Sequence, residues 1–452
     1  MLRARFVFKL EKVYNPGMNM FAQHRNKLLE LFPKEKALIF LKGGDLIFQD
    51  DTDLEYEFRQ ESNFYYLTGI TEPGFAAILE VPSGKLSLIF PKRSRFDVVF
   101  RGLNEDKKHF AKKYGANNAL EKTEVAQFIK NSGARRIHVL KRGHLALRDR
   151  AFVVNDQHLV DCLHALRRVK DASELRLIKK ANDISSAGHE AVMKATRPGM
   201  FEYELRSVFE EVAMQAGLQR QAYNGIYASG KNAATLHYVA NNRKIQSGSL
   251  VLVDAGAECE EYASDITRTF PANGKFSKQQ AEWYDAVLCI QKSMIQKVAP
   301  GVSMADLNRE TEKMVIEALK GLALVKGALS DLEEYEIGRL FFPHSLGHLL
   351  GLDTHDVGAR VSTQKKNGIR LGPVLEPGMV LTIEPGLYFI PALLQPALKD
   401  KKLSQFLNKE KIHDLFDAGG IRIEDNIVVT QEGRRNLTTA AKERKEIEKL
   451  MQ

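Results

Sequence analysis

The sequence predicts an α/β domain followed by a larger α+β domain that is built from two similar halves. Short apolar segments alternate with helical segments up to about residue 166. A capping-box pattern, Asp171 with Glu174 three positions later, then opens a long helix. Further along, a proline–glycine turn before an amphipathic helix occurs twice. These observations predict two domains, residues 1–166 and residues 167–452.

The strand-like segments of the first domain are residues 37–41, 76–81, 86–90 and 137–140. Helical stretches lie between several of them, as in a sheet that is covered by helices. We place the domain boundary between residues 165 and 172, where the capping box begins. Every candidate catalytic or metal-binding residue comes after this boundary.

The second domain has a weak internal repeat with an offset of 102 residues. Pro198-Gly199 and Pro300-Gly301 each precede an amphipathic helix that ends near a glycine, Gly217 or Gly321. Two related halves would close over a shared site, one half supplying aspartates and the other a histidine and glutamates. Chance similarity of two proline–glycine turns is the alternative interpretation of this pattern.

The composition is that of an ordinary globular protein with a large core. The chain has 452 residues, of which 44% are hydrophobic and 27% charged, and a formal net charge of +9. Lysines and arginines are dispersed in small groups such as Lys92-Arg93, with acids nearby. We therefore expect no nucleic-acid partner.

The cysteines and the apolar segments bear on localisation. Cys162, Cys259 and Cys289 are odd in number and lack metal-binding spacing, which favours a reducing compartment. No apolar stretch approaches the roughly twenty residues that would span a bilayer, so we expect no membrane association. Residues 1–10 are basic and partly apolar, but neither a transit nor a secretory pattern is complete. The expected compartment is the cytoplasm.

Two aspartates of the second domain are predicted to lie side by side. Asp254 ends an apolar run at residues 249–253, and Asp265 lies in a second strand-like stretch at residues 264–270. A hairpin would bring their carboxylates together. They would then repel each other unless one took up a proton or a cation lay between them. The alternative is a turn that carries solvated acids.

Two glutamates complete a set of four acids. Glu384 directly follows the apolar run at residues 380–383, and Glu424 ends the alternating segment 421–424. Either one alone is more often structural, but four carboxylates and one imidazole carry about four negative charges, which two divalent cations would cancel. Oxygen-rich ligation without a thiolate suits manganese better than zinc.

The imidazole comes from a histidine-rich stretch that contains His344, His348 and His355. This stretch superficially resembles the two-histidine zinc helix of metalloproteases. That helix needs a glutamate after its first histidine, where Ser345 stands, and Gly347 would weaken a helix at its centre. We therefore expect no zinc helix here, and His348 is the fifth candidate metal ligand.

These segments together resemble the pita-bread metallopeptidases, the family of methionine aminopeptidase, aminopeptidase P and prolidase. The similar motifs are FRQESNF at residues 58–64, LTG at 67–69 and TLHY at 235–238, together with all five ligand segments. The resemblance implies a pita-bread fold with a pseudo-two-fold repeat and a peptidase that uses two divalent metal ions. It also implies a homodimer.

The resemblance assigns the five ligands individually. In that family the counterparts of Asp265 and Glu424 bridge the two metals. The counterpart of Asp254 chelates one metal, and those of His348 and Glu384 hold the other.

The resemblance also assigns the remaining catalytic roles. A water shared by two cations would lose a proton and attack the carbonyl that precedes proline, with Glu384 relaying the proton. His355 would help to stabilise the oxyanion, and His237 and His344 would place the substrate. Tyr223 matches a family tyrosine near the metal site.

Two features favour the Xaa-Pro dipeptidase, or prolidase, branch over aminopeptidase P. Forty positions separate Glu384 from Glu424, a segment that resembles the prolidase insertion, whereas the aminopeptidase P segment is much shorter. Arg370 falls where prolidases place the arginine that binds the C-terminal carboxylate of the substrate. Arg422 also belongs to the substrate-binding set, although its place on the strand face of Glu424 favours orienting an acidic ligand.

Three functions remain open from the sequence. The first is an Xaa-Pro dipeptidase that acts on small peptides with proline at the second position. The second is an aminopeptidase P that releases the residue before proline from longer peptides. The third is a catalytically inactive binding module, whose usual mark is eroded ligands. None of the five ligand residues is missing here.

Overall fold

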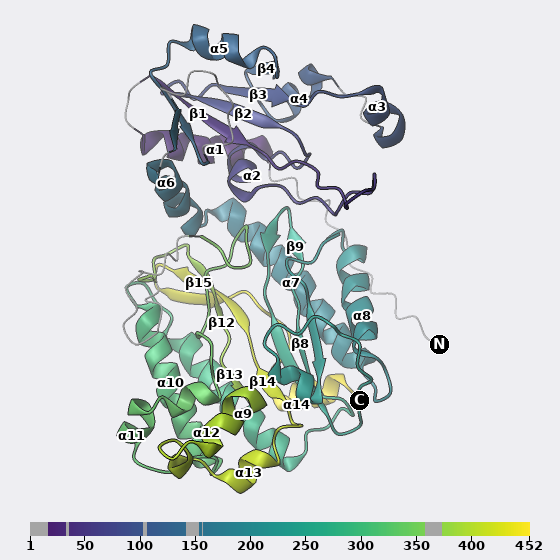
Figure 1. The fold of residues 1–452 in the computed structure, drawn as a ribbon, viewed down its shortest axis with the longest axis vertical. Coiled ribbons are helices and arrows are strands. Elements are labelled where there is room, and N and C mark those ends of the chain that lie inside the picture. Colours follow the sequence, from purple (N-terminus) through teal and green to yellow (C-terminus); the bar gives the residue numbers. More distant parts are fainter. Residues whose placement is uncertain (1–16, 33–35, 103–105, 142–152, 156, 358–372) are drawn as a thin grey trace. The chain divides into compact units, whose positions relative to one another are not determined.

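The structure is a computed structural model that describes residues 17–452 apart from 33–35, 103–105, 142–152, 156 and 358–372 (Figure 1). The described chain forms two compact units, and the break between them falls after Arg167. This position lies within the interval that the sequence predicts for the domain boundary. No described helix is long and apolar enough to cross a membrane.

The first unit contains a mixed six-stranded sheet in the order β4-β3-β2-β1-β5-β6. Its central strand β1 pairs antiparallel with β2 and parallel with β5. The strands are β1 (Ala37–Lys42), β2 (Ala76–Val81), β3 (Leu86–Phe90), β4 (Asn118–Glu121), β5 (Arg136–Val139) and β6 (Val153–Asn155). The helices are α1 (Gly17–Glu30), α2 (Ser62–Thr68), α3 (Arg95–Arg101), α4 (Lys107–Lys113), α5 (Val125–Ser132) and α6 (Gln157–Arg168).

The four predicted strands of this unit are confirmed as β1, β2, β3 and β5. Their apolar side chains, such as Phe40, Ile78 and Val139, are buried together with Val125 of α5. The outer strands β4 and β6 were not predicted. Both are short, and β4 has no fully buried residue, so its sequence lacks the apolar run that marks a strand.

The second unit begins with the predicted long helix. Helix α7 (Ala172–Ala195) has Asp171 as its N-cap, whose side chain accepts hydrogen bonds from the amides of Ser173 and Glu174. The Glu174 carboxylate accepts in return from the Asp171 amide at 2.8 Å, which confirms the capping box.

The two halves of this unit repeat the same elements. The first half contains α7, α8 (Glu202–Gln215), β7 (Ile226–Ser229), β8 (Leu250–Asp254) and β11 (Thr267–Pro271). The second contains α9 (Lys278–Lys297), α10 (Met304–Gly321), β12 (Val380–Ile383), β15 (Asp425–Thr430) and β16 (Gly433–Asn436). Figure 1 shows the strands of both halves flanked by these helices.

Matching hydrogen bonds show that the repeat is structural rather than a chance similarity. The Gly199 amide donates to the Ile245 carbonyl at 2.8 Å, and the Gly301 amide donates to the Leu375 carbonyl at the same distance. Both glycines have a positive φ, +95° and +83°, which follows from the turn after each proline. As predicted, both helices end near a glycine, α8 two residues before Gly217 and α10 at Gly321.

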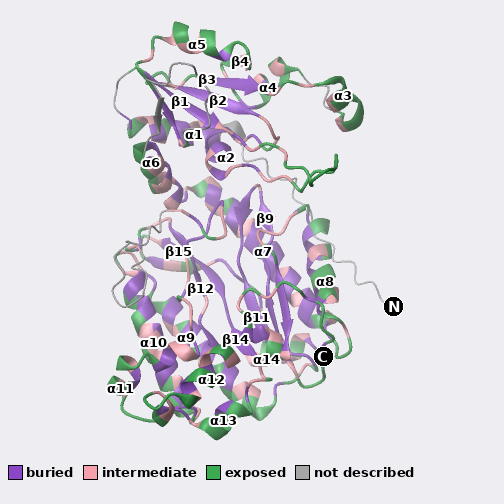
Figure 2. Ribbon diagram, viewed as in Figure 1, coloured by how far each residue is buried: buried purple, intermediate pink, exposed green. Residues whose placement is uncertain are grey.

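The remaining elements connect and cover the two halves. They are η2 (Gly230–Ala234), β9 (Glu258–Cys259), β10 (Tyr262–Ala263), α11 (Leu329–Glu334), η3 (Ile337–Leu340), β13 (Gly386–Tyr388), α12 (Pro391–Lys399), η4 (Ser404–Phe406), α13 (Lys409–His413), β14 (Gly420–Arg422) and α14 (Arg444–Leu450). The long segment between Glu384 and Glu424 contains α12 and α13. Figure 2 shows that the strands of this unit are buried and that exposed residues lie on the covering helices.

Candidate metal centre

Two strands of the first half bring Asp254 and Asp265 together. Strand β8 ends at Asp254 and pairs antiparallel with β11, so that Asp254 lies opposite Thr267. This pairing confirms the predicted antiparallel arrangement, although the connection contains the additional β9–β10 hairpin and the strand begins at Thr267. Gly256 is required here, because a Cβ atom would lie only 1.8 Å from the Ser264 carbonyl oxygen.

In the second half, an extended segment places His348 beside Glu384. The Thr382 amide donates to the His348 carbonyl at 2.9 Å, and the Glu384 amide donates to the Leu346 carbonyl at 2.8 Å. A Cβ atom at Gly347 would lie 2.0 Å from the Thr382 carbonyl oxygen, so glycine permits this close approach. Residues 343–350 form no helix, which confirms that this stretch is not the zinc helix of metalloproteases.

Glu424 joins the two halves. It lies between β14 and β15 and forms an isolated bridge with Thr267 of β11. The Glu424 amide donates to the Thr267 carbonyl at 3.0 Å, and the Thr267 hydroxyl donates to Glu424 Oε2 at 2.7 Å. The glutamate is therefore fixed through both its backbone and its side chain.

The five predicted ligand residues converge on one site. His348 Nε2 lies 3.4 Å from Asp265 Oδ2 and 3.5 Å from Glu384 Oε1. One ligand atom from each of Asp265, His348 and Glu424 lies within 4.8 Å of the other two. His348 Nδ1 contacts the Leu349 carbonyl at 3.1 Å, and a proton on this nitrogen leaves the lone pair of Nε2 directed at the acids.

The buried carboxylates of the site favour the binding of positive charge. Burial, and then the Asp254 carboxylate, raise the pKa of Asp265 well above its ordinary value. Burial and Asp265 similarly raise the pKa of Glu424, and burial and Glu424 raise that of Glu384. Asp265 Oδ1 is buried and has no hydrogen-bond partner. A site of clustered carboxylates, one imidazole and one unpartnered oxygen fits divalent cations.

Asp254 has two protein partners. The Tyr223 hydroxyl donates to its Oδ1 at 2.5 Å, and Arg422 Nη2 donates to its Oδ2 at 2.6 Å. Burial and the Asp254 carboxylate raise the pKa of Tyr223 well above its ordinary value, so this hydroxyl keeps its proton. Arg422 and Tyr223, both predicted to bind substrate, thus contact the predicted metal ligand Asp254 in the structure. For the buried Arg422, orienting an acidic ligand is the better of its two predicted roles.

Arg422 also changes the charge count at the site. The sequence alone suggests that two divalent cations neutralise four carboxylates. With the guanidinium beside Asp254, the pocket carries about three negative charges, and two divalent cations would leave one positive charge to balance an anionic nucleophile.

The three other histidines gather at the edge of this site. His344 Nε2 lies 2.8 Å from the Tyr388 hydroxyl, and its Nδ1 lies 2.8 Å from the Ser345 carbonyl. Burial, with Arg422 nearby, lowers the pKa of His344 to about 3, so this imidazole is neutral. The His355 ring lies 4.2 Å from the His348 ring. His237 is exposed and interacts electrostatically with both His344 and His355.

Several residues of the site had no assigned role from the sequence. Tyr388 accepts a hydrogen bond from Arg422 Nη1 at 2.9 Å, and Thr382 donates to Glu384 at 3.2 Å. Period-two alternation along the strands could have indicated Thr267 and Thr382, because each lies two positions from a ligand residue. Arg370 lies outside the described residues.

Sequence comparison places both units in known families. Metallopeptidase family M24 matches residues 176–431, and the N-terminal domain of aminopeptidase P matches residues 21–140. The chain belongs to metallopeptidase family M24. The M24 match covers the whole candidate metal centre, from Tyr223 to Glu424.

Individual relatives match over almost the entire chain. A probable Xaa-Pro aminopeptidase of Verticillium alfalfae is 36% identical, over 93% of this chain and 93% of the relative. The human Xaa-Pro dipeptidase is 35% identical, over 96% of this chain and 93% of the relative. The structure of zinc-substituted Escherichia coli aminopeptidase P in complex with product is 31% identical with a TM-score of 0.83, and covers 96% of this chain and 98% of that chain. These matches confirm the pita-bread fold.

Proposed function

We propose that this M24 peptidase hydrolyses the bond before proline in peptides with proline at the second position, most readily in Xaa-Pro dipeptides. The convergence of Asp254, Asp265, His348, Glu384 and Glu424 on one buried site carries this proposal. The names of the full-length relatives support the proline specificity. Since all five ligand types are present, we favour an enzyme over a catalytically inactive binding module.

The proposed metals are two manganese ions, held by the four carboxylates and His348 Nε2. Hard oxygen ligands favour manganese, and no cysteine is among the residues of the site. When bound, such cations lower the pKa of water and polarise a carbonyl group. We assign Asp265 and Glu424 to both metals, Asp254 to one, and His348 with Glu384 to the other.

The protein residues have separate proposed tasks. The carboxylate of Glu384, whose pKa is raised by burial, can take a proton from water and pass it to the leaving nitrogen of proline. Neutral His344 is held by Tyr388 and positions the substrate together with His237. His355 is placed to stabilise the developing oxyanion. Proline has no amide hydrogen before the scissile bond, so recognition has to use other groups.

Aminopeptidase P activity is the second candidate, and the match to Escherichia coli aminopeptidase P favours it. Hydrolysis rates of Gly-Pro and of a Gly-Pro-Xaa tripeptide separate the two. We expect a kcat/KM at least tenfold higher for Gly-Pro. A tripeptide preference would establish the aminopeptidase and contradict the dipeptidase.

Arg370 provides a sharper test of the dipeptidase branch. The variant Arg370→Ala is expected to lower kcat/KM for Gly-Pro by about tenfold or more, because a charged hydrogen bond to the terminal carboxylate contributes about 1.5–3 kcal/mol. The tripeptide rate should change less. Equal losses for both substrates would contradict the carboxylate-binding role.

We propose that the protein forms a homodimer. Support comes from an exposed apolar surface on the first unit, here named the α3 patch, in which Arg101 lies over the rings of Phe48 and Phe96. Figure 2 shows α3 as exposed. Large exposed apolar surfaces mark interaction sites. The exposed apolar residues of the patch are Ile47, Phe48, Leu54, Tyr56, Phe96, Val98, Val99 and Phe100.

Light scattering tests the dimer. The wild-type protein is expected at about twice the chain mass of 50.9 kDa, and Phe100→Glu is expected at the monomer mass because a carboxylate in an apolar interface is costly. Met214→Glu is the control, since Met214 is also an exposed apolar residue but lies on α8, outside the α3 patch. A monomeric wild type, or a dimeric Phe100→Glu, would contradict the proposal.

We also propose a cytoplasmic location. The structure describes all three cysteines, Cys162, Cys259 and Cys289, and they form no disulfide bonds, as expected in a reducing compartment. Fractionation of the cells that make the protein tests this assignment.

A further inference from the structure

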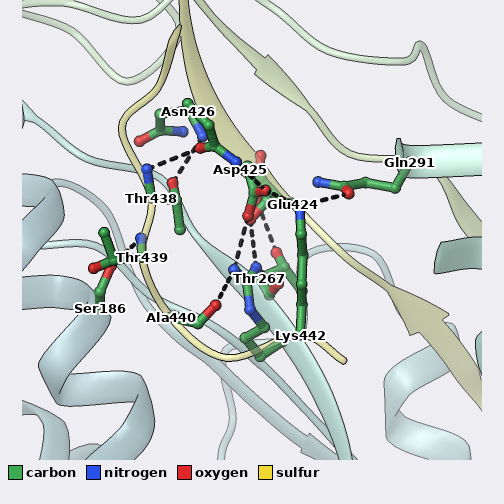
Figure 3. Close-up of polar contacts among 12 residues, drawn as sticks. Ser186, Thr267, Gln291, Glu424, Asp425, Asn426, Thr438, Thr439, Ala440 and Lys442 are labelled. Carbon is green, nitrogen blue, oxygen red and sulfur yellow. Dashed lines mark hydrogen bonds and ion pairs between the residues drawn. The ribbon is translucent and has the colours of Figure 1, made fainter. Parts of the chain in front are cut away.

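We infer that the C-terminal segment 436–442 belongs to the scaffold of the metal centre, because it anchors Arg268 and Asp425 and through them positions Glu424. The inference rests on the proposed metal centre and extends it. Figure 3 shows Thr438, Thr439, Ala440 and Lys442 of this segment around Glu424, Asp425 and Thr267.

Arg268 links Glu424 to this segment through a fully satisfied guanidinium. Its side chain is completely buried, and each of its five N–H donors has a partner. Nη1 donates to the Thr267 and Glu424 carbonyls at 2.9 and 2.7 Å. The other three donate to the Asp425 carboxylate and to the Ala440 and Ala441 carbonyls. One rigid group therefore fixes both the backbone of Glu424 and the C-terminal segment.

Asp425 anchors the strand from the face opposite to Glu424. Successive side chains of an extended strand point to opposite faces, and Asp425 directly follows Glu424. The Asp425 carboxylate is completely buried and accepts hydrogen bonds from Arg268 at 2.7 Å, Asn436 at 2.7 Å and Lys442 at 2.5 Å. Lys442 also donates to Gln291 of α9 at 3.0 Å.

The same segment is connected to Asp265, one of the two proposed ligands in the first half. The Asp265 amide donates to Asn426 Oδ1 at 2.9 Å, and Asn426 Nδ2 donates to the Asp265 carbonyl at 2.5 Å. The Asn426 amide in turn donates to the Thr438 hydroxyl at 2.9 Å, and that hydroxyl donates to Asn182 of α7 at 3.1 Å. Thus Thr438 supports Asp265 and Lys442 supports Glu424.

These contacts give the segment a consequence for metal affinity. Asp265 and Glu424 come from different halves, so their separation depends on what holds β11 against the start of β15. Loss of a partner of a ligand residue typically lowers metal affinity about 10–100-fold. Arg268, Asp425 and Lys442 are therefore positioning residues that act through Glu424.

Two conservative substitutions test the inference without creating a large cavity in the core. Lys442→Met removes the ammonium group but keeps an unbranched side chain, and Thr438→Val removes the hydroxyl but keeps the shape. The matched control is Lys292→Met, which breaks the exposed Lys292–Glu443 pair beside the same segment. Calorimetric titration with Mn²⁺ is expected to give about tenfold weaker binding for both variants and an unchanged value for the control.

Two metal-free measurements separate positioning from loss of fold. In chelated protein, amide hydrogen exchange at residues 424–426 is expected to be faster in both variants, while Tm stays within a few degrees of wild type. Mn²⁺ affinities within twofold of wild type in both variants would overturn the inference, as would an equal loss in the control. A wild type that takes up no Mn²⁺ would instead overturn the proposed metal centre itself.

Discussion

Replacing Asp265 by asparagine is expected to abolish most of the activity of this peptidase. The carboxylate is assigned to both metals, and the amide that replaces it is a neutral, weaker ligand. We expect kcat/KM for Gly-Pro to fall by about 10³-fold, or about 4 kcal/mol of transition-state stabilisation. Metal content measured on the purified variant should fall with the activity.

The fold of this variant should survive. Asn426 holds the backbone of Asp265 and does not contact its carboxylate oxygens. Because burial raises the pKa of the Asp265 carboxyl, a neutral amide removes an unfavourable charge from the metal-free protein. The Tm in chelator should therefore be no lower than that of wild type.

The control for Asp265→Asn is Asp285→Asn. Asp285 lies on the surface in a pair with Arg444 and should lose little, because exposed pairs contribute about 0–1 kcal/mol. An Asp265→Asn protein with two bound metals and wild-type kcat/KM would contradict the assignment of this ligand.

Removal of metal is expected to have the second large effect. A chelator should eliminate Gly-Pro hydrolysis and lower Tm at pH 8 by about 10 °C. This shift corresponds to a free metal concentration of about a thousand times Kd, at which binding stabilises the folded protein by about 4 kcal/mol. Mn²⁺ added in excess should restore both. Unchanged activity after complete removal of metal would contradict a metal-dependent mechanism.

The difference in Tm between metal-loaded and chelated protein should grow as the pH rises. Burial raises the pKa of Asp265, Glu384 and Glu424 in the folded, metal-free state. Above the unfolded value of about 4 the folded state then binds more protons than the unfolded state, so its stability decreases as the pH rises. In the metal-bound protein, cations take the place of these protons, so the stability of the folded state does not decrease in this way as the pH rises. Thermal unfolding between pH 5 and pH 8 measures the difference, and a constant or shrinking difference would contradict this account.

The sequence indicates the ligand-bearing elements because each has a local pattern. Asp254 and Glu384 follow apolar runs that form β8 and β12, and the capping box at Asp171 depends on residues three positions apart. The repeat is visible because both turns need glycine. Such signals are short-range, so they can be read before the fold is known.

The residues that support the ligands could not be predicted in the same way. Arg268 bonds to backbone carbonyls 156 to 173 positions away, and any residue type offers such a carbonyl. The contact between His344 and Tyr388 spans 44 positions and depends on how β13 is placed. No local sequence pattern encodes these pairings. The two-residue strands β9 and β10, which lie between β8 and β11, are also too short to give a recognisable pattern.

The spread of the ligands along the chain has a consequence for biosynthesis. Asp254 and Asp265 leave the ribosome long before Glu424, and Arg268 finds its last acceptors only when residues 440 and 441 have been made. The full set of hydrogen bonds around Glu424 can therefore form only after these last residues have been synthesised. A product that ends between residues 424 and 440 contains all five proposed ligand residues but lacks the Ala440 and Ala441 carbonyls to which Arg268 donates.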